Sequence, residues 1–317
     1  MIVDSTRLIA ALREAIEPSR VTAAAPLATF TTLRVGGPAA ALVRAEDAAD
    51  LCAIARVTET LDLPWLVIGK GSNLLIADTG WPGVAVVLGR GFRGVDVDDT
   101  RVLAGAAEPM PALAVKVARQ GLGGLAFGVA IPGTVGGAVR MNAGAHGGEI
   151  RDVLDWADVV RMGAGAESER WDGQRLGFSY RHSALPGDAI VVRAQLRLER
   201  ADAGRIADDM AEMRQWRRDN QPINEPSCGS VFRNPPGDSA GRLIEAAGLK
   251  GFGVGGAQVS LRHANFITVG AGARAADVYE IIRTARHRVR EAFGVDLQTE
   301  VVLAGFDLQD VPAEVTT

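Results

Sequence analysis

Four polar residues occur where no structural task explains them: Tyr180, Arg181, Ser230 and Glu300. Tyr180 and Arg181 lie in a loop just before an alternating strand, and the forked, permanently charged guanidinium of arginine suits a carboxylate or a phosphate. Ser230 lies between a glycine and two apolar residues, and Glu300 interrupts an apolar final strand, where a carboxylate is costly unless it is paired. The alternatives are a surface ion pair for Arg181, a turn hydroxyl for Ser230 and a solvent-facing edge position for Glu300.

A glycine-rich turn, Gly69-Lys70-Gly71-Ser72-Asn73, separates two short apolar stretches, WLVI and LLIAD. Exposed backbone N–H groups in such a turn, together with a lysine, form a site suited to a pyrophosphate. A simple hairpin turn uses the same residue types, glycine, serine and asparagine. The turn by itself therefore predicts a phosphate site or a hairpin and favours neither.

A second glycine-rich stretch runs from Phe127 to Gly148 and holds seven glycines. Each glycine inside a helix or strand costs about 0.5–1 kcal/mol relative to alanine, so some compensating role is expected. Ile131 to Thr134 predicts a turn, Thr134 can cap the run of small residues that follows, and this surface permits close approach of a flat or anionic ligand. We interpret the stretch as a site for a phosphate-bearing cofactor. A tight glycine-mediated packing contact is the alternative.

The elements that must position these residues follow from hydrophobic periodicity and turn signals. The pattern predicts helices over 5–17, 46–61, 110–120, 202–219, 239–247 and 276–293, and strands over 64–68, 83–88, 94–97, 101–104, 153–161, 190–199, 265–269 and 299–304. Short strands between 84 and 200 indicate an antiparallel-rich α+β domain, distinct from a βαβ-like start.

The run GFGVGG at 251–256 matches the pattern G-x-G-x-x-G. It follows a helix and leads into strand-like QVSL, whereas a dinucleotide-binding fingerprint follows a strand and opens a helix. We therefore interpret this run as a loop. The proline-rich segment QPINEPSCGSVFRNPPGD is long for a connection inside a compact domain, which indicates a functional loop.

Composition limits the function classes. With 317 residues, 47% of them hydrophobic, and a net charge of −4, the chain is expected to form two or three globular domains and to bind no nucleic acid. No apolar run reaches membrane-spanning length and the start lacks a signal-peptide core, so we expect a cytoplasmic protein with no membrane partner. Two distant cysteines and four scattered histidines predict no metal site. Cys228 is interpreted as a small buried thiol rather than a nucleophile.

Seven segments in order resemble the signatures of one family, the UDP-N-acetylenolpyruvoylglucosamine reductases (MurB), over about residues 22–305. The resemblance implies an α+β protein with a vanillyl-alcohol-oxidase-like (PCMH-type) FAD-binding fold in two subdomains and a C-terminal α+β domain for the UDP-sugar. The expected limits are 1–83, joined by the tail 304–317, then 84–201 and 202–303. The segments are TTLRVGGPA, VIGKGSNLLIAD, AFGVAIPGTVGGAVRMNAGAHGGEI, FSYRHS, PSCGSVFRNP, GAQVSLRHANFI and LQTEVVLAG.

The resemblance also implies roles for individual residues. Ser230 matches the family's proton donor, Arg181 its active-site arginine and Glu300 its acidic residue. Positions near the substrate match Tyr180, Arg233, Asn234 and His263. The residues expected to bind non-covalent FAD are Gly69, Lys70, Gly71, Ser72, Asn73, Ile131, Pro132, Gly133, Thr134, Gly136, Gly137, Gly144 and Ile190.

The implied reaction reduces UDP-N-acetylglucosamine enolpyruvate to UDP-N-acetylmuramate for peptidoglycan synthesis. NADPH reduces FAD, hydride passes from flavin N5 to the enolpyruvyl alkene, and Ser230 protonates the α-carbon. The chain goes almost directly from Tyr180-Arg181 into the next strand, so it resembles the shorter type that lacks a tyrosine-bearing loop. We expect a monomer. The alternatives are another FAD-dependent oxidase or dehydrogenase of the same fold, and a non-catalytic nucleotide-sugar binder.

Overall fold

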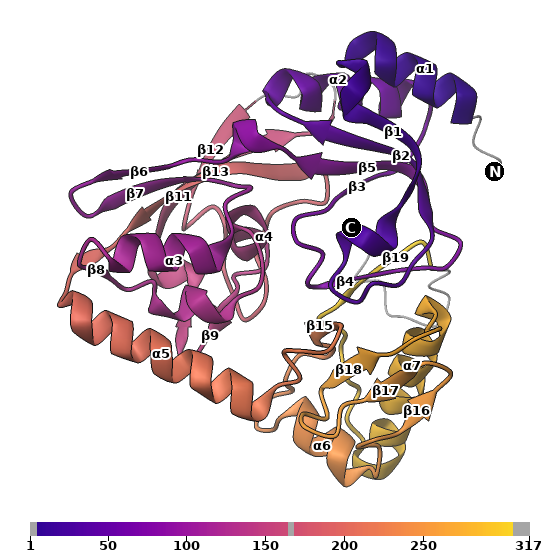
Figure 1. Ribbon diagram of the computed structural model, residues 1–317, viewed down its shortest axis with the longest axis vertical. Helices are drawn as coiled ribbons and strands as arrows, with labels where there is room; N and C mark the ends of the chain where they lie inside the picture. The colour runs from indigo at the N-terminus through magenta and orange to yellow at the C-terminus, as the bar shows by residue number, and fades with distance from the viewer. Residues whose placement is uncertain (1–4, 164–167, 307–317) are drawn as a thin grey trace.

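The computed structural model describes residues 5–163 and 168–306 of the chain. The described residues form three packed units, each with a sheet and its own helices (Figure 1). The first unit comprises residues 5–88 with 302–306, the second 89–220 and the third 221–301. Within the described ranges, no helix is both long and apolar enough to cross a membrane.

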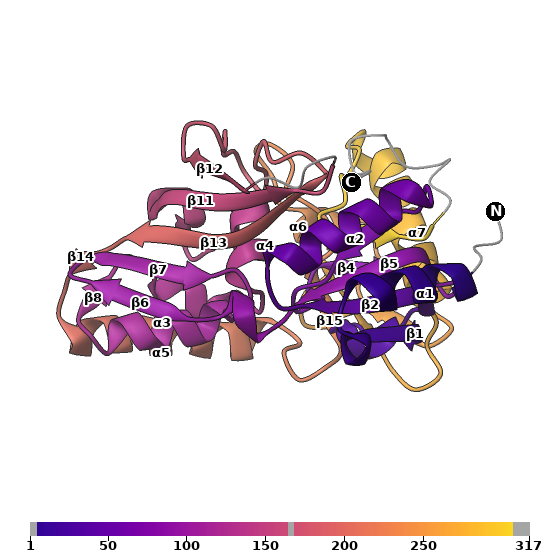
Figure 2. The same cartoon turned by 90° about the horizontal axis from the view of Figure 1, so that it is seen from above.

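The first unit is built on a four-stranded sheet in the order β1-β2-β5-β3, in which β1 is antiparallel to β2 and the other pairs are parallel. Two helices pack together beside this sheet (Figures 1 and 2). A separate parallel pair joins β4 to the last strand, β19. The elements are α1 (Ser5–Ala15), β1 (Val21–Pro26), β2 (Pro38–Ala45), α2 (Ala48–Thr60), β3 (Trp65–Val67), β4 (Leu74–Ile76), β5 (Trp81–Leu88) and β19 (Val302–Ala304).

The central strand β5 is buried on both faces. Val84 and Val86 pack with α1 and α2, whereas Ala85 packs on the other side with Leu66. A parallel strand covered on both faces forms a continuous apolar run in the sequence, as GVAVV does. The predicted boundary between residues 83 and 84 falls inside β5, so the first unit extends to Leu88.

The second unit has a five-stranded sheet in the order β12-β11-β13-β7-β6, in which every neighbouring pair is antiparallel. The antiparallel α+β organisation predicted from the sequence is thus confirmed for this part of the chain. Its elements are β6 (Val95–Asp98), β7 (Arg101–Gly105), α3 (Met110–Ala118), β8 (Leu122–Gly123), α4 (Val135–Arg140), β9 (Gly144–Ala145), β10 (Gly148–Glu149), β11 (Leu154–Arg161), β12 (Ser168–Asp172), β13 (Ala189–Arg197), β14 (Glu199–Arg200) and α5 (Ala203–Asn220).

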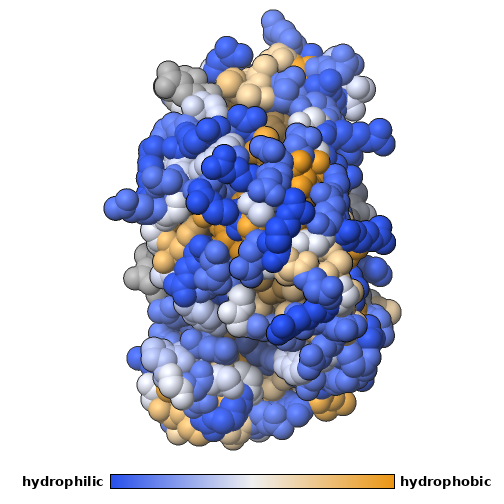
Figure 3. Space-filling model, turned by 90° about the vertical axis from the view of Figure 1, so that its left-hand side faces the viewer, coloured by the Kyte–Doolittle hydropathy of each residue, from blue (hydrophilic) through white to orange (hydrophobic). Residues whose placement is uncertain are grey.

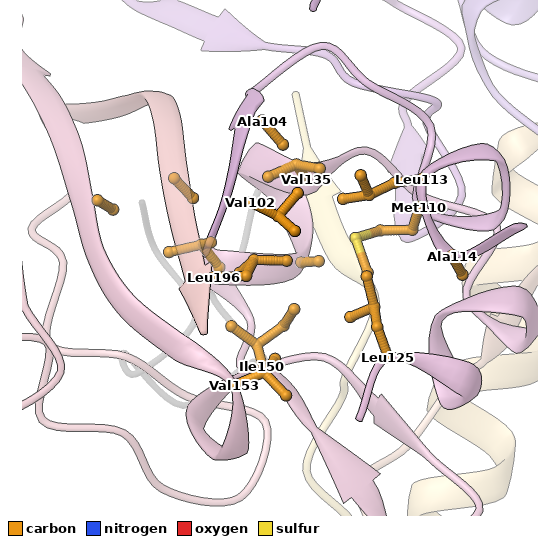
Figure 4. Packing of buried hydrophobic residues seen from close by; sticks show 14 of the residues in the cluster. Val102, Ala104, Met110, Leu113, Ala114, Leu125, Val135, Ile150, Val153 and Leu196 are labelled. Carbon is orange, nitrogen blue, oxygen red and sulfur yellow. The ribbon is translucent and has the colours of Figure 1, made fainter. Parts of the chain in front are cut away.

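The core of the second unit lies between one face of its sheet and the helices. Val102 and Leu196 from the sheet face Met110 and Leu113 of α3 (Figure 4). On the opposite face, Asp158 pairs with two arginines of the neighbouring strands, as expected for an antiparallel sheet with one solvated side. Hydrophilic side chains cover most of the molecular face seen from the left of Figure 1, with apolar residues in small groups (Figure 3).

Helix α5 crosses from the second unit to the third. Its N-cap is Asp202, whose side chain accepts a hydrogen bond from Arg205 N at 2.8 Å. Ile206 and Met210 are buried in the core of the second unit. The boundary predicted between residues 201 and 202 therefore separates α5 from the core in which it is packed, and the third unit begins after Asn220.

The third unit has an antiparallel sheet in the order β15-β18-β17-β16, packed with α6 and α7. The predicted amphipathic face of α7 is buried, including Val278, Ile281 and Val289. The GFGVGG run forms part of the hairpin of β16 and β17, which confirms that it is not a dinucleotide fingerprint. The elements are β15 (Ser227–Ser230), α6 (Ala240–Ala246), β16 (Gly253–Val254), β17 (Ala257–Val259), β18 (Phe266–Val269) and α7 (Ala275–Phe293).

Several strands were not predicted, among them β1, β2 and β12. β2 begins at a proline and is rich in alanine, and both residue types are depleted in strands, so its composition does not mark it as a strand. Residues 307–317, most of the tail expected to return to the first domain, lie outside the described residues. Short 3₁₀ helices complete the structure: η1 (Pro18–Arg20), η2 (Leu27–Phe30), η3 (Arg90–Phe92), η4 (Ala126–Ala130) and η5 (Ile150–Asp152).

Candidate active site

A cavity of about 1440 Å³ is lined by residues of all three units. Pockets for small ligands commonly measure about 300–1,000 Å³, so this cavity has room for more than one bound molecule. All of the expected FAD-binding residues line it, and so do Arg181, Ser230, Asn234 and Glu300. The tertiary structure therefore brings two glycine-rich segments and the candidate catalytic residues to one place.

The first glycine turn, Gly69 to Asn73, is not a hairpin. The strand before it, β3, pairs with β5, and the strand after it, β4, pairs with β19. Gly71 has φ +58, and a Cβ at this position would lie 2.1 Å from Phe30 O. Only glycine therefore fits the backbone path at residue 71. The exposed Lys70 lines the cavity beside this turn.

The second glycine segment, Ile131 to Gly137, contains the N-terminus of α4. Thr134 is its N-cap, as predicted, and its Oγ1 accepts a hydrogen bond from Gly137 N at 3.4 Å. A Cβ at Gly136 would lie 3.0 Å from Ala106 Cβ. Glycine therefore permits α4 to pack closely against the loop that joins β7 to α3. This contact supports the packing interpretation for Gly136, which also lines the cavity together with Gly133 and Gly137.

The two glycine segments face each other. A Cβ at Gly69 would lie 2.9 Å from Thr134 Oγ1, and one at Gly133 would lie 3.9 Å from Ser72 Oγ. Side chains larger than hydrogen would fill the gap between the two backbones. The paired segments thus form a cradle that fits an extended, phosphate-bearing cofactor such as FAD.

Arg181 is held at the edge of this cradle in a left-handed conformation, with φ +54. Its Nη2 donates to Gly144 O at 2.8 Å, and its Nε donates to Glu300 Oε1 at 3.1 Å. A left-handed non-glycine residue stores about 1–3 kcal/mol of strain, and such residues concentrate at functional sites. The guanidinium has five N–H donors, and these two bonds leave capacity for an anionic ligand.

Glu300 forms hydrogen bonds with residues of all three units. Its backbone N donates to Val231 O at 2.8 Å, and its backbone O accepts from Asn73 Nδ2 at 3.0 Å. Burial raises the pKa of the Glu300 carboxyl, while the charges of Arg181 and Arg233 act in the opposite direction. Glu300 is therefore neither a solvent-facing residue nor part of β19, and its carboxyl is able to hold a proton at a higher pH than an exposed glutamate.

Ser230 is the last residue of β15 and pairs with Phe266 of β18. It precedes Val231, whose carbonyl binds Glu300 N, so the hydroxyl-bearing residue and the carboxyl-bearing residue lie on adjoining segments. Cys228, in the same strand, is 1% exposed, and burial raises the pKa of its thiol to about 12. This thiol stays protonated near neutral pH, which confirms the interpretation of Cys228 as a buried structural residue.

Of the four residues expected near the substrate, one lines the cavity and three do not. Asn234 lines the cavity, but its Oδ1 accepts a hydrogen bond from Ala240 N at 3.0 Å, at the start of α6. Tyr180 is exposed next to Arg181, and Arg233 lies close enough to influence the carboxyl of Glu300. His263 packs edge-on against Phe266, and burial lowers its pKa. Tyr180, Arg233 and His263 are outside the cavity wall.

The end of α5 is part of the site, although the sequence pattern did not predict it. Trp216, Arg217 and Gln221 line the cavity, as does His146, whose ring meets that of Trp216 edge-on with centroids 5.2 Å apart. The signal available in the sequence was a tryptophan among the charged residues at the end of the predicted helix. Arginines 44, 90, 93 and 140 also line the cavity. Among the described residues, no cluster of histidine, cysteine, aspartate or glutamate could hold a metal ion.

Comparisons with known proteins agree with this geometry. A model described as "FAD binding domain" matches residues 39–167, and one for the C-terminal domain of UDP-N-acetylenolpyruvoylglucosamine reductase matches 221–304. The reductase of that name from Heliobacterium modesticaldum is 46% identical over 88% of this chain and 89% of its own length. The one from Anaeromyxobacter sp. is 45% identical over 90% of each chain.

Solved structures include the MurB reductase of Thermus caldophilus, with a TM-score of 0.77 and 40% identity over 88% of this chain and 97% of that one. The FAD-binding fold and the C-terminal domain expected from the sequence are thereby confirmed. The chain belongs to the UDP-N-acetylenolpyruvoylglucosamine reductase (MurB) family.

Proposed function

We propose that this protein reduces UDP-N-acetylglucosamine enolpyruvate to UDP-N-acetylmuramate, using NADPH and non-covalently bound FAD, in the synthesis of peptidoglycan precursors. One observation carries the proposal. The cavity with the two glycine segments also contains Arg181 bonded to Glu300, with Ser230 on the adjoining strand. A cofactor cradle, a cation and a hydroxyl donor are the groups that reduction of an enolpyruvyl double bond requires.

The cradle supports FAD as the resident cofactor. Gly69 to Asn73 and the second glycine segment, with Gly144 and Ile190, would hold the cofactor. When bound, FAD would supply the hydride transfer from NADPH to the outer alkene carbon of the substrate. The protein's part is to orient the two molecules and to control charge and protons.

Arg181 is proposed to bind the enolpyruvyl carboxylate of the substrate. Addition of hydride at the outer carbon places negative charge on the α-carbon and this carboxylate, so a fixed cation is most useful as that charge develops. The bonds to Gly144 and Glu300 orient the guanidinium before the substrate arrives. Glu300 holds this geometry and, because burial raises its pKa, is able to retain or share a proton beside the site.

Ser230 is proposed to donate a proton to the α-carbon. A serine hydroxyl is a weak acid, but an enolate-like carbanion is a strong base, and position matters more than the resting pKa of the donor. Its location on the segment adjoining Glu300 supports this role. The proton is then replaced from solvent or through neighbouring groups.

The nucleotide arm of the substrate is proposed to lie along the end of α5. Trp216 offers a flat, half-exposed ring at the cavity wall, and Arg217 is a cation whose pKa is lowered by burial. Aromatic stacking on a base and a nearby cation suit a uridine diphosphate. Tyr180, Arg233, Asn234 and His263 remain proposed contacts for the substrate at the adjoining surface.

We further propose that the protein is a cytoplasmic monomer with an FAD-binding subdomain over 1–88 and 302–306, a second over 89–220, and a substrate domain over 221–301. The buried β5 and the packing of α5 on the second core support these limits in place of 83/84 and 201/202. Elution volume with light scattering tests the oligomeric state.

The first test is a visible spectrum of the purified protein, followed by NADPH oxidation with and without UDP-N-acetylglucosamine enolpyruvate. Flavin absorbance with substrate-dependent NADPH consumption is the expected result. Another oxidase or dehydrogenase of this fold would bind flavin but show no turnover with this substrate. A nucleotide-sugar binder would stay colourless after incubation with FAD.

A further inference from the structure

The chain that leaves α4 holds the turn that carries Arg181. Asn142 lies just after α4, is 0% exposed and has φ +40. Its Nδ2 donates to Ser179 O at 2.9 Å and to Glu149 Oε2 at 2.7 Å, and its Oδ1 accepts from Arg151 N at 2.9 Å. A buried amide with three hydrogen bonds has one fixed orientation, so it fixes its partners as well.

Among the groups that Asn142 binds, the turn formed by residues 179 to 182 matters for catalysis, because it carries Arg181. Ser179 N donates to His182 O at 3.1 Å, and His182 N donates to Ser179 O at 3.2 Å. Arg181 lies inside this turn with its left-handed φ. Strain of that kind persists only where the surroundings hold the backbone. Asn142 supplies such support at Ser179, the first residue of the turn.

The last turn of α4 supports the other side of the same loop. Ser183 Oγ donates to Arg140 O at 2.6 Å, and Arg140 Nη2 donates to Pro186 O at 3.2 Å. Because α4 begins in the second glycine segment, one short helix joins the cofactor cradle to the loop of Arg181. The position of the guanidinium is therefore coupled to the cradle through α4 and the residues that follow it.

We propose that Asn142 is a positioning residue for Arg181: by binding Ser179 O it sets the guanidinium against Glu300 and the substrate carboxylate. This inference rests on the proposed function for the substrate carboxylate, but the Arg181–Glu300 geometry is independent of it. Asn142 touches neither cofactor nor substrate in this role. It acts through the turn.

The test compares Asn142→Gly with wild type. Glycine adopts φ +40 without strain, so this variant removes the three side-chain hydrogen bonds while preserving the backbone. Reduction of FAD by NADPH is expected to change less than threefold, and reoxidation by the enolpyruvyl substrate is expected to slow about 10- to 100-fold, the range for a misplaced catalytic group. Equal slowing of both half-reactions would overturn the proposal.

A double-mutant cycle with Arg181→Ala separates positioning from general damage. If Asn142 acts through Arg181, adding Asn142→Gly to Arg181→Ala should slow the substrate half-reaction by less than about twofold. Multiplicative effects of the two substitutions would overturn the proposal. If Asn142→Gly does not fold, Asn142→Asp takes its place, because a carboxylate still accepts from Arg151 N but no longer donates to Ser179 O. A selective effect on the substrate half-reaction is again expected, and no effect would count against the proposal.

A readout without turnover keeps the inference separate from the proposed function. In protein labelled with ¹³C at glutamate carboxyls, with Glu300 assigned from Glu300→Gln, displacement of Arg181 should raise the pKa of Glu300 because the arginine charge lowers it. Asn142→Gly and Arg181→Ala should therefore shift the titration in the same direction. An unchanged titration in Asn142→Gly would overturn the inference even if the wild-type enzyme proves active, whereas an inactive wild type with the shift would overturn only the substrate assignment.

Discussion

Arg181 Nε lies 3.1 Å from Glu300 Oε1, although the two residues are 119 positions apart in the chain. The contact joins the second unit to the segment that enters β19, beside the strand that ends at Ser230. It places a cation, a carboxyl with a raised pKa and a hydroxyl at one wall of the cavity.

Ser230→Ala should leave reduction of FAD by NADPH nearly unchanged and slow its reoxidation by the enolpyruvyl substrate by about 10²–10⁴-fold, the usual contribution of a positioned proton donor. Rapid-mixing absorbance of the flavin follows the two half-reactions separately. Ser227→Ala is the matched control, because Ser227 lies in the same strand but outside the cavity wall. Comparable loss in both half-reactions would indicate damage to the cofactor site instead.

Glu300→Gln should change how stability depends on pH. Burial raises the pKa of Glu300 above its ordinary value of 4.5, so between 4.5 and the raised value the native protein binds more protons than the unfolded chain. The free energy of unfolding then falls as pH rises through this window. Glutamine does not titrate, so the variant should lose this part of the decline. Urea unfolding at several pH values from about 4.5 upward measures it, and parallel curves for the two proteins would contradict a raised pKa.

Gly71→Ala should abolish or strongly weaken retention of FAD. The new Cβ would lie 2.1 Å from Phe30 O at a residue with φ +58, so the turn has to move. Gly272→Ala is the control, since Gly272 has φ +75 but no atom within 4 Å of an added Cβ, and it should show only the left-handed cost of about 1–2 kcal/mol. The bound flavin per chain after gel filtration and the midpoint of thermal unfolding report the two effects. Equal flavin content in both variants would argue against the cradle.

Trp216→Ala should raise the KM for the UDP substrate and leave kcat within about twofold, since stacking on a base contributes about 1–3 kcal/mol of binding. Trp216→Phe keeps an aromatic face and should restore most of the affinity. Calorimetric titration with UDP measures the binding affinity that this contact contributes, without turnover. A kcat that falls with an unchanged KM would remove Trp216 from the nucleotide site.

Local pattern was sufficient for much of the secondary structure. Apolar spacing predicts α2 and α7 to within a few residues, and a run of charged residues predicts α5. Glycine, proline and threonine predict the turn before α4 together with its cap at Thr134. These features depend on residues that are close in the chain, so hydrophobic periodicity and turn residues are enough to predict them. The strand β2 was not predicted because its alanine-rich sequence has a low strand propensity, and the strand depends on pairing with β1 and β5.

The amino-acid sequence by itself determined the two glycine segments, the identities of Arg181, Ser230 and Glu300, and the resemblance to one enzyme family. Only the tertiary structure decided that Gly69 faces Thr134 and that Arg181 bonds Glu300. It also decided that α5 packs on the core of the second unit and that the end of α5 lines the cavity. The physical reason is that such contacts join residues far apart in the chain. Their geometry arises from the packing of whole units, which no local pattern of residues encodes.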